Sequence, residues 1–441
     1  MTRCPKLTMI ICSLMLASQA HADPAGDESR RQSMMADMRA SATANDRANF
    51  DSQQRQQADA ARYSGGSGSS GSSAGNGSGS NSSGSSYAGG GSGPSRSTGP
   101  QSIVASYSFT IRRQESPSAV ATRLEQEAGN GNALSAYNLG RVYYTGFDGL
   151  ARNDVKARQW FAKAAELGQP GAQSQYGYML HDAIGGGVDR AGALQWTKKA
   201  ADQGDTYGEA LFGFYTIAAK PIDTPAPEAV KMLRRAADKG DLLAQGTLGT
   251  IVYALGNGAP EDMTQSAHYS ALAAAQGNAV AQTQYGRLLV TGGGIPKDEA
   301  AGLAQLRKAA AQNNTEAMIL LGTLAFTGQA MPQDNAAGAS WFKRAADAGD
   351  AGAAGQYAQL LLGGNYGVTM DEAAGVRYAR ISADKGNING QMTLARCYYN
   401  GNGVAVDMKP ALFWFRKAAA QGDVDAKKAL ADPKMVEAAR G

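Results

Sequence analysis

Apolar, Ala-rich stretches alternate with Gly-rich turns along most of this chain, and the pattern repeats every 36 or 37 residues. Each period ends in a Gly or Asn that closes an apolar stretch, and these positions, called zero residues below, are Gly131, Gly168, Gly204, Gly240, Gly277, Asn313, Gly349, Gly386 and Gly422. A fixed period of this length is typical of stacked helix pairs, each too small to bury its apolar face alone. The pattern therefore predicts an all-α fold.

The first helix of each predicted pair carries a large apolar residue followed by a small one, as in Leu139-Gly140 and Leu321-Gly322. Six copies have Gly at the small position. Gly inside a helix costs roughly 1 kcal/mol relative to Ala, so an offsetting gain is needed. We expect this face of the first helix to pack closely against a partner helix, where a Cβ atom would interfere.

A Gly-rich turn follows each first helix, and an Asn or Asp recurs where the second helix should begin, at Asn153, Asp189, Asp262, Asp298, Asp334, Asp371 and Asp407. We interpret these residues as N-caps. The third repeat has Thr224-Pro225 instead, which predicts a Thr cap followed by Pro. Each turn holds one or two carboxylates, fewer than the oxygens that calcium requires, so no metal site is predicted.

The second helix carries a mostly aromatic column, at Trp160, Trp196, Met232, Tyr269, Gln305, Trp341, Tyr378 and Trp414. A Lys or Arg and then an Ala-Ala pair follow this column in most copies. The aromatic side chains either form the core between helices or line a ligand site, and we favour the core. The third, fourth and fifth copies lack Trp, which marks the centre of the array as degenerate.

These columns resemble the Sel-one-like repeat, a relative of the tetratricopeptide repeat. The match is close at Leu139-Gly140, Tyr143, Asp154 and the run from Trp160 to Ala165, and again at Gly403-Val404, Asp407, Trp414-Phe415 and the run from Lys417 to Ala419. The resemblance implies a right-handed α-solenoid superhelix of about eight helix-turn-helix repeats. It also implies protein–protein interaction, including envelope assembly and host contact.

Residues 1–22 resemble a secretory signal, because Arg3 and Lys6 precede an apolar run and Ala20-His21-Ala22 offers a cleavage site. We expect a polar arm at 23–63 that is disordered or helical, a flexible Gly/Ser-rich linker at 64–100 and an extended segment at 101–116. The solenoid should occupy 117–431, with a tail at 432–441. The predicted product is an exported bacterial protein, periplasmic or secreted, without a transmembrane segment.

The extended segment contains an alternating β-type pattern, with Ile103, Tyr107, Phe109 and Ile111 on one side. Two interpretations stay open. The segment either lies across the first helices of the array or pairs as a strand with another chain.

Composition and isolated polar residues suggest no catalytic chemistry. The formal charge of +4 is mixed along the chain, so nucleic-acid binding is not expected. His181 and His268 lie in different repeats without partners at metal-binding spacing, and Cys397, predicted to be buried, is the only Cys after residue 22. We therefore expect no catalytic, cofactor or metal site, and no enzyme activity.

The inner surface of a curved solenoid is lined mainly by first helices and suits an extended or helical partner segment. By analogy with the family, the candidate partner-binding residues are Tyr137, Arg141, Tyr144, Tyr178, Phe214, Tyr253, Arg287, Arg396 and Tyr399. The alternative is that several of these Tyr belong to the core. The expected function is a non-enzymatic adaptor for protein partners in the cell envelope or outside the cell. A scaffold associated with peptidoglycan or another polysaccharide is the second hypothesis.

Overall fold

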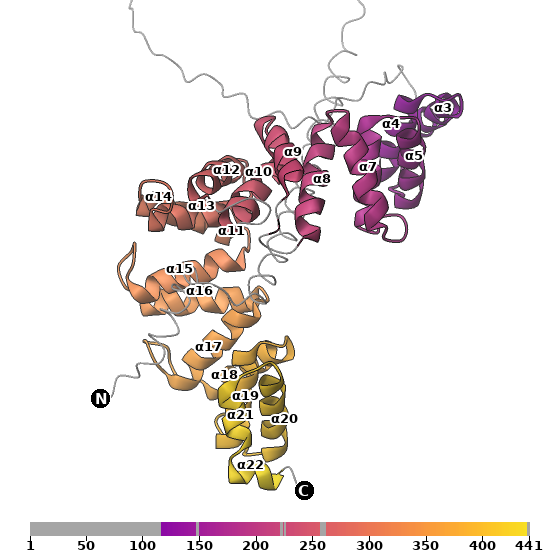
Figure 1. Cartoon of the computed structure of the whole chain (residues 1–441). Coiled ribbons are helices and arrows are strands. Elements are labelled where there is room, and N and C mark those ends of the chain that lie inside the picture. Colours follow the sequence, from indigo (N-terminus) through magenta and orange to yellow (C-terminus); the bar gives the residue numbers. More distant parts are fainter. Residues whose placement is uncertain (1–115, 147–149, 221–223, 225, 256–261, 439–441) are drawn as a thin grey trace, which may run out of the picture.

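The computed structural model describes residues 116–146, 150–220, 224, 226–255 and 262–438, and every element in these ranges is a helix. The helices form a curved, elongated stack that runs from α3 at one end to α22 at the other (Figure 1). The predicted all-α solenoid is confirmed. The predicted signal, arm and linker, together with the β-type pattern at 103–111, lie outside the described residues.

The first helices of the eight repeats are α4 (Ala133–Thr145), α6 (Pro170–His181), α8 (Thr206–Ala219), α10 (Leu242–Thr247) with its continuation, α13 (Ala279–Thr291), α15 (Thr315–Thr327), α17 (Ala351–Gly363) and α19 (Ile388–Asn400). In the fourth repeat α10 continues through the π-helix η1 (Leu248–Val252) into α11 (Tyr253–Leu255). The sequence did not predict this π-helical turn, which lies in the degenerate centre of the array.

The second helices are α5 (Asp154–Glu166), α7 (Arg190–Asp202), α9 (Pro227–Asp238), α12 (Met263–Ala275), α14 (Glu299–Ala311), α16 (Asn335–Asp347), α18 (Glu372–Asp384) and α20 (Met408–Ala420). The helix α3 (Pro117–Gly129) precedes the first repeat, and α21 (Val424–Leu430) and α22 (Pro433–Ala438) follow the last. The segment 432–441, expected only as a tail, therefore includes a helix, and its Met435 is fully buried. None of the described helices has the length and apolar character needed to cross a membrane.

Local signals in the sequence correctly predict most helix ends. All the zero residues, including Asn313 with φ of 64°, have the positive φ expected after a helix. The side chains of the seven predicted Asn and Asp caps each accept a hydrogen bond from the backbone of the second helix. The third repeat differs from the prediction, since Ala226 precedes Pro227 at the start of α9 and no side chain caps that helix.

The close packing predicted for the small residues is confirmed. A Cβ atom on Gly140 would lie 2.7 Å from the Phe161 ring, and one on Gly213 would lie 2.4 Å from Leu233 Cγ. Both Phe161 and Leu233 are fully buried. The absent side chain on the first helix thus makes room for a large apolar side chain on the second.

The aromatic column belongs to the core, as favoured, but its burial varies along the chain. Trp414, Tyr269 and Tyr378 are buried, whereas Trp160, Trp196 and Trp341 are partly buried and pack against the core. The residue after each Trp fills the core, as Phe342 does at 3% exposure, whereas the neighbouring Trp341 is only partly buried. The Arg344 guanidinium covers the Trp341 ring, with Cζ 4.3 Å from the ring centre, and Lys199 covers Trp196 at 4.1 Å. The two Trp rings therefore lie at the edge of the core beneath a cation, a favourable geometry for cation–π attraction.

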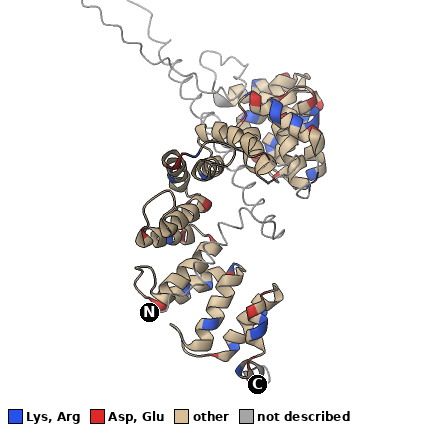
Figure 2. Ribbon diagram, turned by 60° about the vertical axis from the view of Figure 1, so that its left-hand side comes forward, with Lys and Arg blue, Asp and Glu red and all other residues tan. Residues whose placement is uncertain are grey.

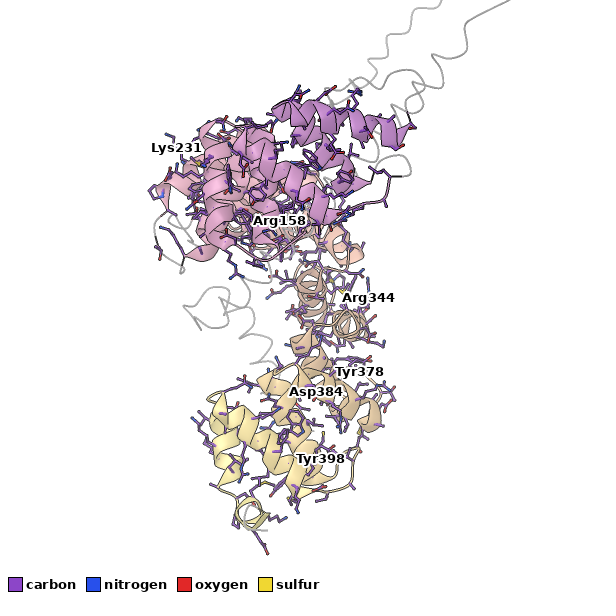
Figure 3. The ribbon with its side chains drawn as sticks, turned by 90° about the vertical axis from the view of Figure 1, so that its right-hand side faces the viewer. Arg158, Lys231, Arg344, Tyr378, Asp384 and Tyr398 are labelled. Atoms are coloured by element: carbon purple, nitrogen blue, oxygen red, sulfur yellow. The ribbon has the colours of Figure 1, made fainter. Side chains whose placement is uncertain are left out.

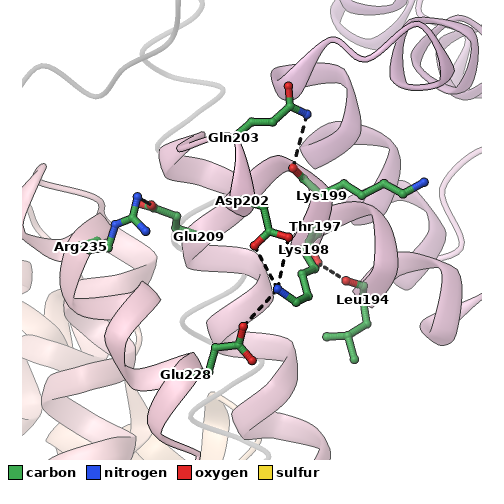
Figure 4. Close-up of polar contacts among 9 residues, drawn as sticks. All are labelled: Leu194, Thr197, Lys198, Lys199, Asp202, Gln203, Glu209, Glu228 and Arg235. Carbon is green, nitrogen blue, oxygen red and sulfur yellow. Dashed lines mark hydrogen bonds and ion pairs between the residues drawn. The ribbon is translucent and has the colours of Figure 1, made fainter.

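Pairs of side-chain amides join the two helices of several repeats. In four repeats a glutamine at the end of the second helix donates to a glutamine on the first helix at 2.7–2.9 Å, namely Gln203 to Gln173, Gln276 to Gln245, Gln312 to Gln282 and Gln421 to Gln391. In the third repeat Glu209 and Lys239 occupy the equivalent positions and form an ion pair, and Arg235 also contacts Glu209 (Figure 4). Sequence reasoning missed these pairs, although their residues recur at fixed offsets from the zero residues.

Candidate partner-binding surface

First helices of neighbouring repeats contact one another directly, as α6 does with α8, α8 with α10, and α17 with α19. No consecutive second helices pack this closely in the part of the chain that the structure describes. The stack is curved (Figure 1). Because the first helices lie closer to one another than the second helices do, they form the inner side of this curve. The candidate residues can now be placed on this inner side.

Three of the candidates cluster in the first repeat. Tyr137 and Tyr144 contact the buried Phe161 ring, with centroid distances of 5.7 and 6.4 Å. The Arg141 guanidinium lies 5.7 Å from the Tyr137 ring centre and is itself only 7% exposed. Burial raises the pKa of the Tyr137 hydroxyl, although the nearby Arg141 opposes that effect. The structure brings these three residues together, with only part of each tyrosine exposed.

The candidates of the next three repeats are buried. Tyr178 is 7% exposed, Phe214 is fully buried and Tyr253 is 3% exposed. The Tyr253 hydroxyl accepts a hydrogen bond from Arg234 Nε at 2.8 Å, and its ring stacks on Tyr269 with centroids 6.0 Å apart. The inner face was expected to expose these residues. Their burial gives them a packing role in this structure instead.

The candidates of the C-terminal repeats are more accessible. Arg287 forms an ion pair with Glu316 of the next repeat and donates to Gln284 at 3.3 Å. Arg396 is exposed. Tyr399 is half-buried and lies beneath Lys434, whose Nζ is 5.8 Å from the ring centre. Desolvation, reinforced by Asp432, raises the pKa of the Tyr399 hydroxyl.

The position ten residues after each zero residue shows how the inner face changes along the array. In the first four repeats it holds Arg141, Tyr178, Phe214 and Thr250, and in the last four it holds Arg287, Thr323, Gln359 and Arg396. The amide of Gln359 donates to the Thr393 hydroxyl at 3.2 Å, which links α17 and α19 across this face. Gln359 was missed from sequence because the candidates were chosen as Tyr, Phe and Arg, although its offset matched theirs.

On the outer side of the curve, polar side chains of the second helices make contacts between repeats. Arg344 and Tyr378, labelled in Figure 3, both belong to second helices, and the Tyr378 hydroxyl donates to Asp347 at 2.7 Å. Lys198 lies between Asp202 and Glu228, at 3.0 and 3.1 Å, and so joins α7 to α9 (Figure 4). These contacts tie one repeat to the next on the outside of the curve.

His181 and Cys397, whose side chains are of types used in catalysis or metal binding, each pack among neighbouring residues. His181 stacks on Tyr215 with centroids 3.9 Å apart, and its Nδ1 lies 2.6 Å from Asp182. Cys397 is buried as predicted, and desolvation raises the pKa of its thiol to about 11. The described ranges contain no group of three or more His, Cys, Asp or Glu side chains that could hold a metal ion.

The fold and these surfaces define a helix-pair solenoid of the scaffold type. The chain belongs to the Sel1 repeat family, because more than half of it matches that family over residues 133–169, 170–205, 226–241, 243–278, 279–314, 315–350, 351–387 and 389–423. Proteins with this repeat are generally non-catalytic scaffolds for protein interaction. The family resemblance predicted from the sequence is confirmed.

Solved structures with the same repeat are similar to this one. The protein c5321, a protective antigen present in uropathogenic Escherichia coli strains, is 28% identical over 70% of this chain and 66% of its own, with a TM-score of 0.55. A Sel1 repeat protein from Oxalobacter formigenes is 24% identical over 74% of this chain and 97% of its own, with a TM-score of 0.53. The second likeness shows the fold alone.

One curated relative matches a short stretch. The Arabidopsis thaliana ERAD-associated E3 ubiquitin-protein ligase component HRD3A is 47% identical over 47 residues, which make up 11% of this chain and 7% of that protein. The chain therefore spans slightly less than two thirds of c5321 and a small fraction of HRD3A. These matches support the repeat and its fold.

Proposed function

We propose that this protein is a non-enzymatic scaffold that binds a protein partner along the inner face of its C-terminal repeats. The observation that carries the proposal is the polar column of the last four repeats. There Arg396 is exposed and Arg287 is partly exposed beside Glu316, whereas Tyr178, Phe214 and Tyr253 of the earlier repeats are buried. Two guanidinium groups on one face favour a partner segment that supplies carboxylates or backbone carbonyls.

We also propose that the chain is exported and acts in the periplasm or outside the cell. The signal-like residues 1–22 support this location. The similarity to c5321, a protective antigen of a pathogen, gives further support. A fusion of the full chain to alkaline phosphatase, which is active only after export, tests the location, and an inactive fusion with normal expression would contradict it.

The binding proposal is tested by crosslinking in envelopes, with full-length chain and two matched variants. Arg287→Ala/Arg396→Ala removes charge from the inner face, and Arg307→Ala removes an exposed charge from α14 as the control. We expect the same protein to be crosslinked by wild type and control and to be lost with the inner-face variant. Digestion of the cell wall before capture provides the second arm. Loss of every partner after digestion would favour the polysaccharide scaffold instead.

A further inference from the structure

Helix α20 exposes three basic side chains and an aromatic ring on one face. Lys409, Arg416 and Lys417 are exposed, and Phe413 is 50% exposed. Their spacing places all four within one side of the helix, because residues three and four apart are neighbours on a helix surface. The Lys417 ammonium lies 4.7 Å from the centre of the Phe413 ring. Blue Lys and Arg positions are visible on the helices next to the C-terminus in Figure 2.

The exposed ring is peculiar to the last repeat. The equivalent residue, nine positions before the next zero residue, is Gln159, Gln195, Lys231, His268, Ala304, Ser340 or Arg377 in the other seven copies. Since all seven helices pack with a polar or small residue there, the fold does not require Phe413. An apolar side chain exposed without a packing role is a sign of an interaction surface when it lies within a patch of consistent chemistry.

No acidic residue of α20 itself balances the positive charge of this face. In α7 and α16 an Asp neutralises the Lys four residues before it, with Lys198–Asp202 at 3.0 Å and Lys343–Asp347 at 2.6 Å. The residue equivalent to these Asp is Ala420 in the last repeat, and α20 contains no acidic residue. No ion pair to Arg416 is found within residues 116–438 as described.

Another basic second helix provides an internal comparison. Helix α14 also exposes adjacent bases, Arg307 and Lys308, and has Ala311 where five other copies have an acid. It has Ala304 at the position of Phe413. Among the described second helices, α20 alone combines this positive face with an exposed aromatic ring at the Phe413 position. Val406, in the turn before α20, and Val424, the first residue of α21, are also exposed, at 58% and 62%.

We propose that this face of α20, formed by Lys409, Phe413, Arg416 and Lys417, docks on the surface of an anionic lipid bilayer. The face lies on an outer helix of the curved stack, so it suits a broad, flat surface rather than an inserted peptide. Basic side chains are attracted by anionic head groups, and an aromatic ring enters the interfacial region without needing a preformed pocket. An acidic protein would have to supply both carboxylates and a pocket for Phe413.

This docking is weak and reversible, because it involves one helix face. Each Lys or Arg near an anionic surface contributes roughly fivefold in affinity. Removal of three bases should therefore weaken binding on the order of a hundredfold. The interaction should also weaken as salt is added, since salt screens exposed charges.

The test measures sedimentation of the full chain with vesicles of phosphatidylcholine, with and without phosphatidylglycerol. We expect binding to the anionic vesicles only. Lys409→Ala/Arg416→Ala/Lys417→Ala should abolish it, and Phe413→Ser should weaken it at least roughly threefold because the apolar contact is lost. Ser340 occupies the equivalent position in α16, so Phe413→Ser should fold normally, which circular dichroism verifies.

Matched controls make the outcome decisive. Arg307→Ala/Lys308→Ala on α14 should leave vesicle binding unchanged, whereas Phe413→Trp should give fluorescence that brominated acyl chains quench beyond the wild-type level. Equal binding to neutral vesicles, an equal loss with the α14 variant, or an unquenched Trp would each overturn the proposal. Binding to soluble polyglutamate but not to vesicles would also overturn it, by identifying an acidic protein surface as the occupant.

Discussion

The ammonium of Lys239 lies 3.1 Å from the carboxylate of Glu209 and joins the two helices of the third repeat, at a place where four other repeats have two glutamines. Glu209 is fully buried, and the Lys239 ammonium also donates to the Gly204 carbonyl at 3.3 Å. Gln276, Gln312 and Gln421 donate to the equivalent carbonyls, those of the zero residues Gly240, Gly277 and Gly386 that close the preceding repeats. An ion pair and an amide pair therefore perform the same linking role in one chain.

This equivalence predicts the effect of exchanging the pair. Lys239→Gln should lower the free energy of unfolding by about 1–3 kcal/mol, because it removes one of two cations beside a buried carboxylate. Glu209→Gln/Lys239→Gln should recover most of that loss by restoring the amide pair found elsewhere. Urea unfolding of the two variants measures both effects. A double variant no more stable than Lys239→Gln would show that the ion pair and the amide pair are not equivalent.

The contact between Gly140 and Phe161 predicts a cost for the smallest possible side chain. Gly140→Ala should destabilise the protein by about 1–3 kcal/mol, because the new Cβ would lie 2.7 Å from a fully buried ring. Gly129→Ala is the matched control, since nothing lies within 4 Å of a Cβ at that helical position. The control should be neutral or stabilising by about 0.5 kcal/mol. Equal thermal shifts for the two variants would contradict the packing argument.

The two adjacent aromatic residues of α16 should respond differently to truncation. Phe342→Ala should cost about 3–5 kcal/mol, since the ring is 3% exposed. Trp341→Ala should cost less, about 1–2 kcal/mol, because Trp341 is only partly buried and part of its interaction is with Arg344. Chemical unfolding of both variants provides the comparison. A loss at Trp341 that equals or exceeds the loss at Phe342 would contradict the difference in burial.

The raised pKa of Cys397 predicts a protected thiol. With a pKa of about 11 in the folded protein, the thiolate fraction at pH 8 is roughly a hundredfold below that of an ordinary cysteine. Alkylation of a chain with Cys4→Ser and Cys12→Ser should be slow in buffer, faster toward pH 11, and fast in urea. Because folding raises this pKa, the buried neutral thiol contributes fully to the stability of the folded protein below the ordinary thiol pKa. That contribution is lost as the pH rises through the pKa of the folded protein. Equal rates with and without urea would refute the assignment.

Sequence reasoning was most successful where the cause is local. Asp298 caps α14 and Asn313 has positive φ, as predicted. Both could be predicted because each conformation depends on a few neighbouring residues. It was wrong at the start of α9, where Thr224 and Ala226 both precede a Pro and local rules do not separate them. It assigned the aromatic column to the core but did not predict that Trp414 is buried while Trp341 is only partly buried, because hydrophobic size indicates which residues pack but not how fully each faces the core.

The sequence by itself determined the period, the helix pairs, most of the caps and the family resemblance, since these depend on spacing within about one repeat. The tertiary structure decided which side chains remain accessible. Phe214 and Arg396 share an offset from their zero residues, yet one is fully buried and the other exposed. The curvature of the stack and the side chains of neighbouring repeats set that difference, because burial and charge pairing depend on atoms from several helices that the period alone does not specify.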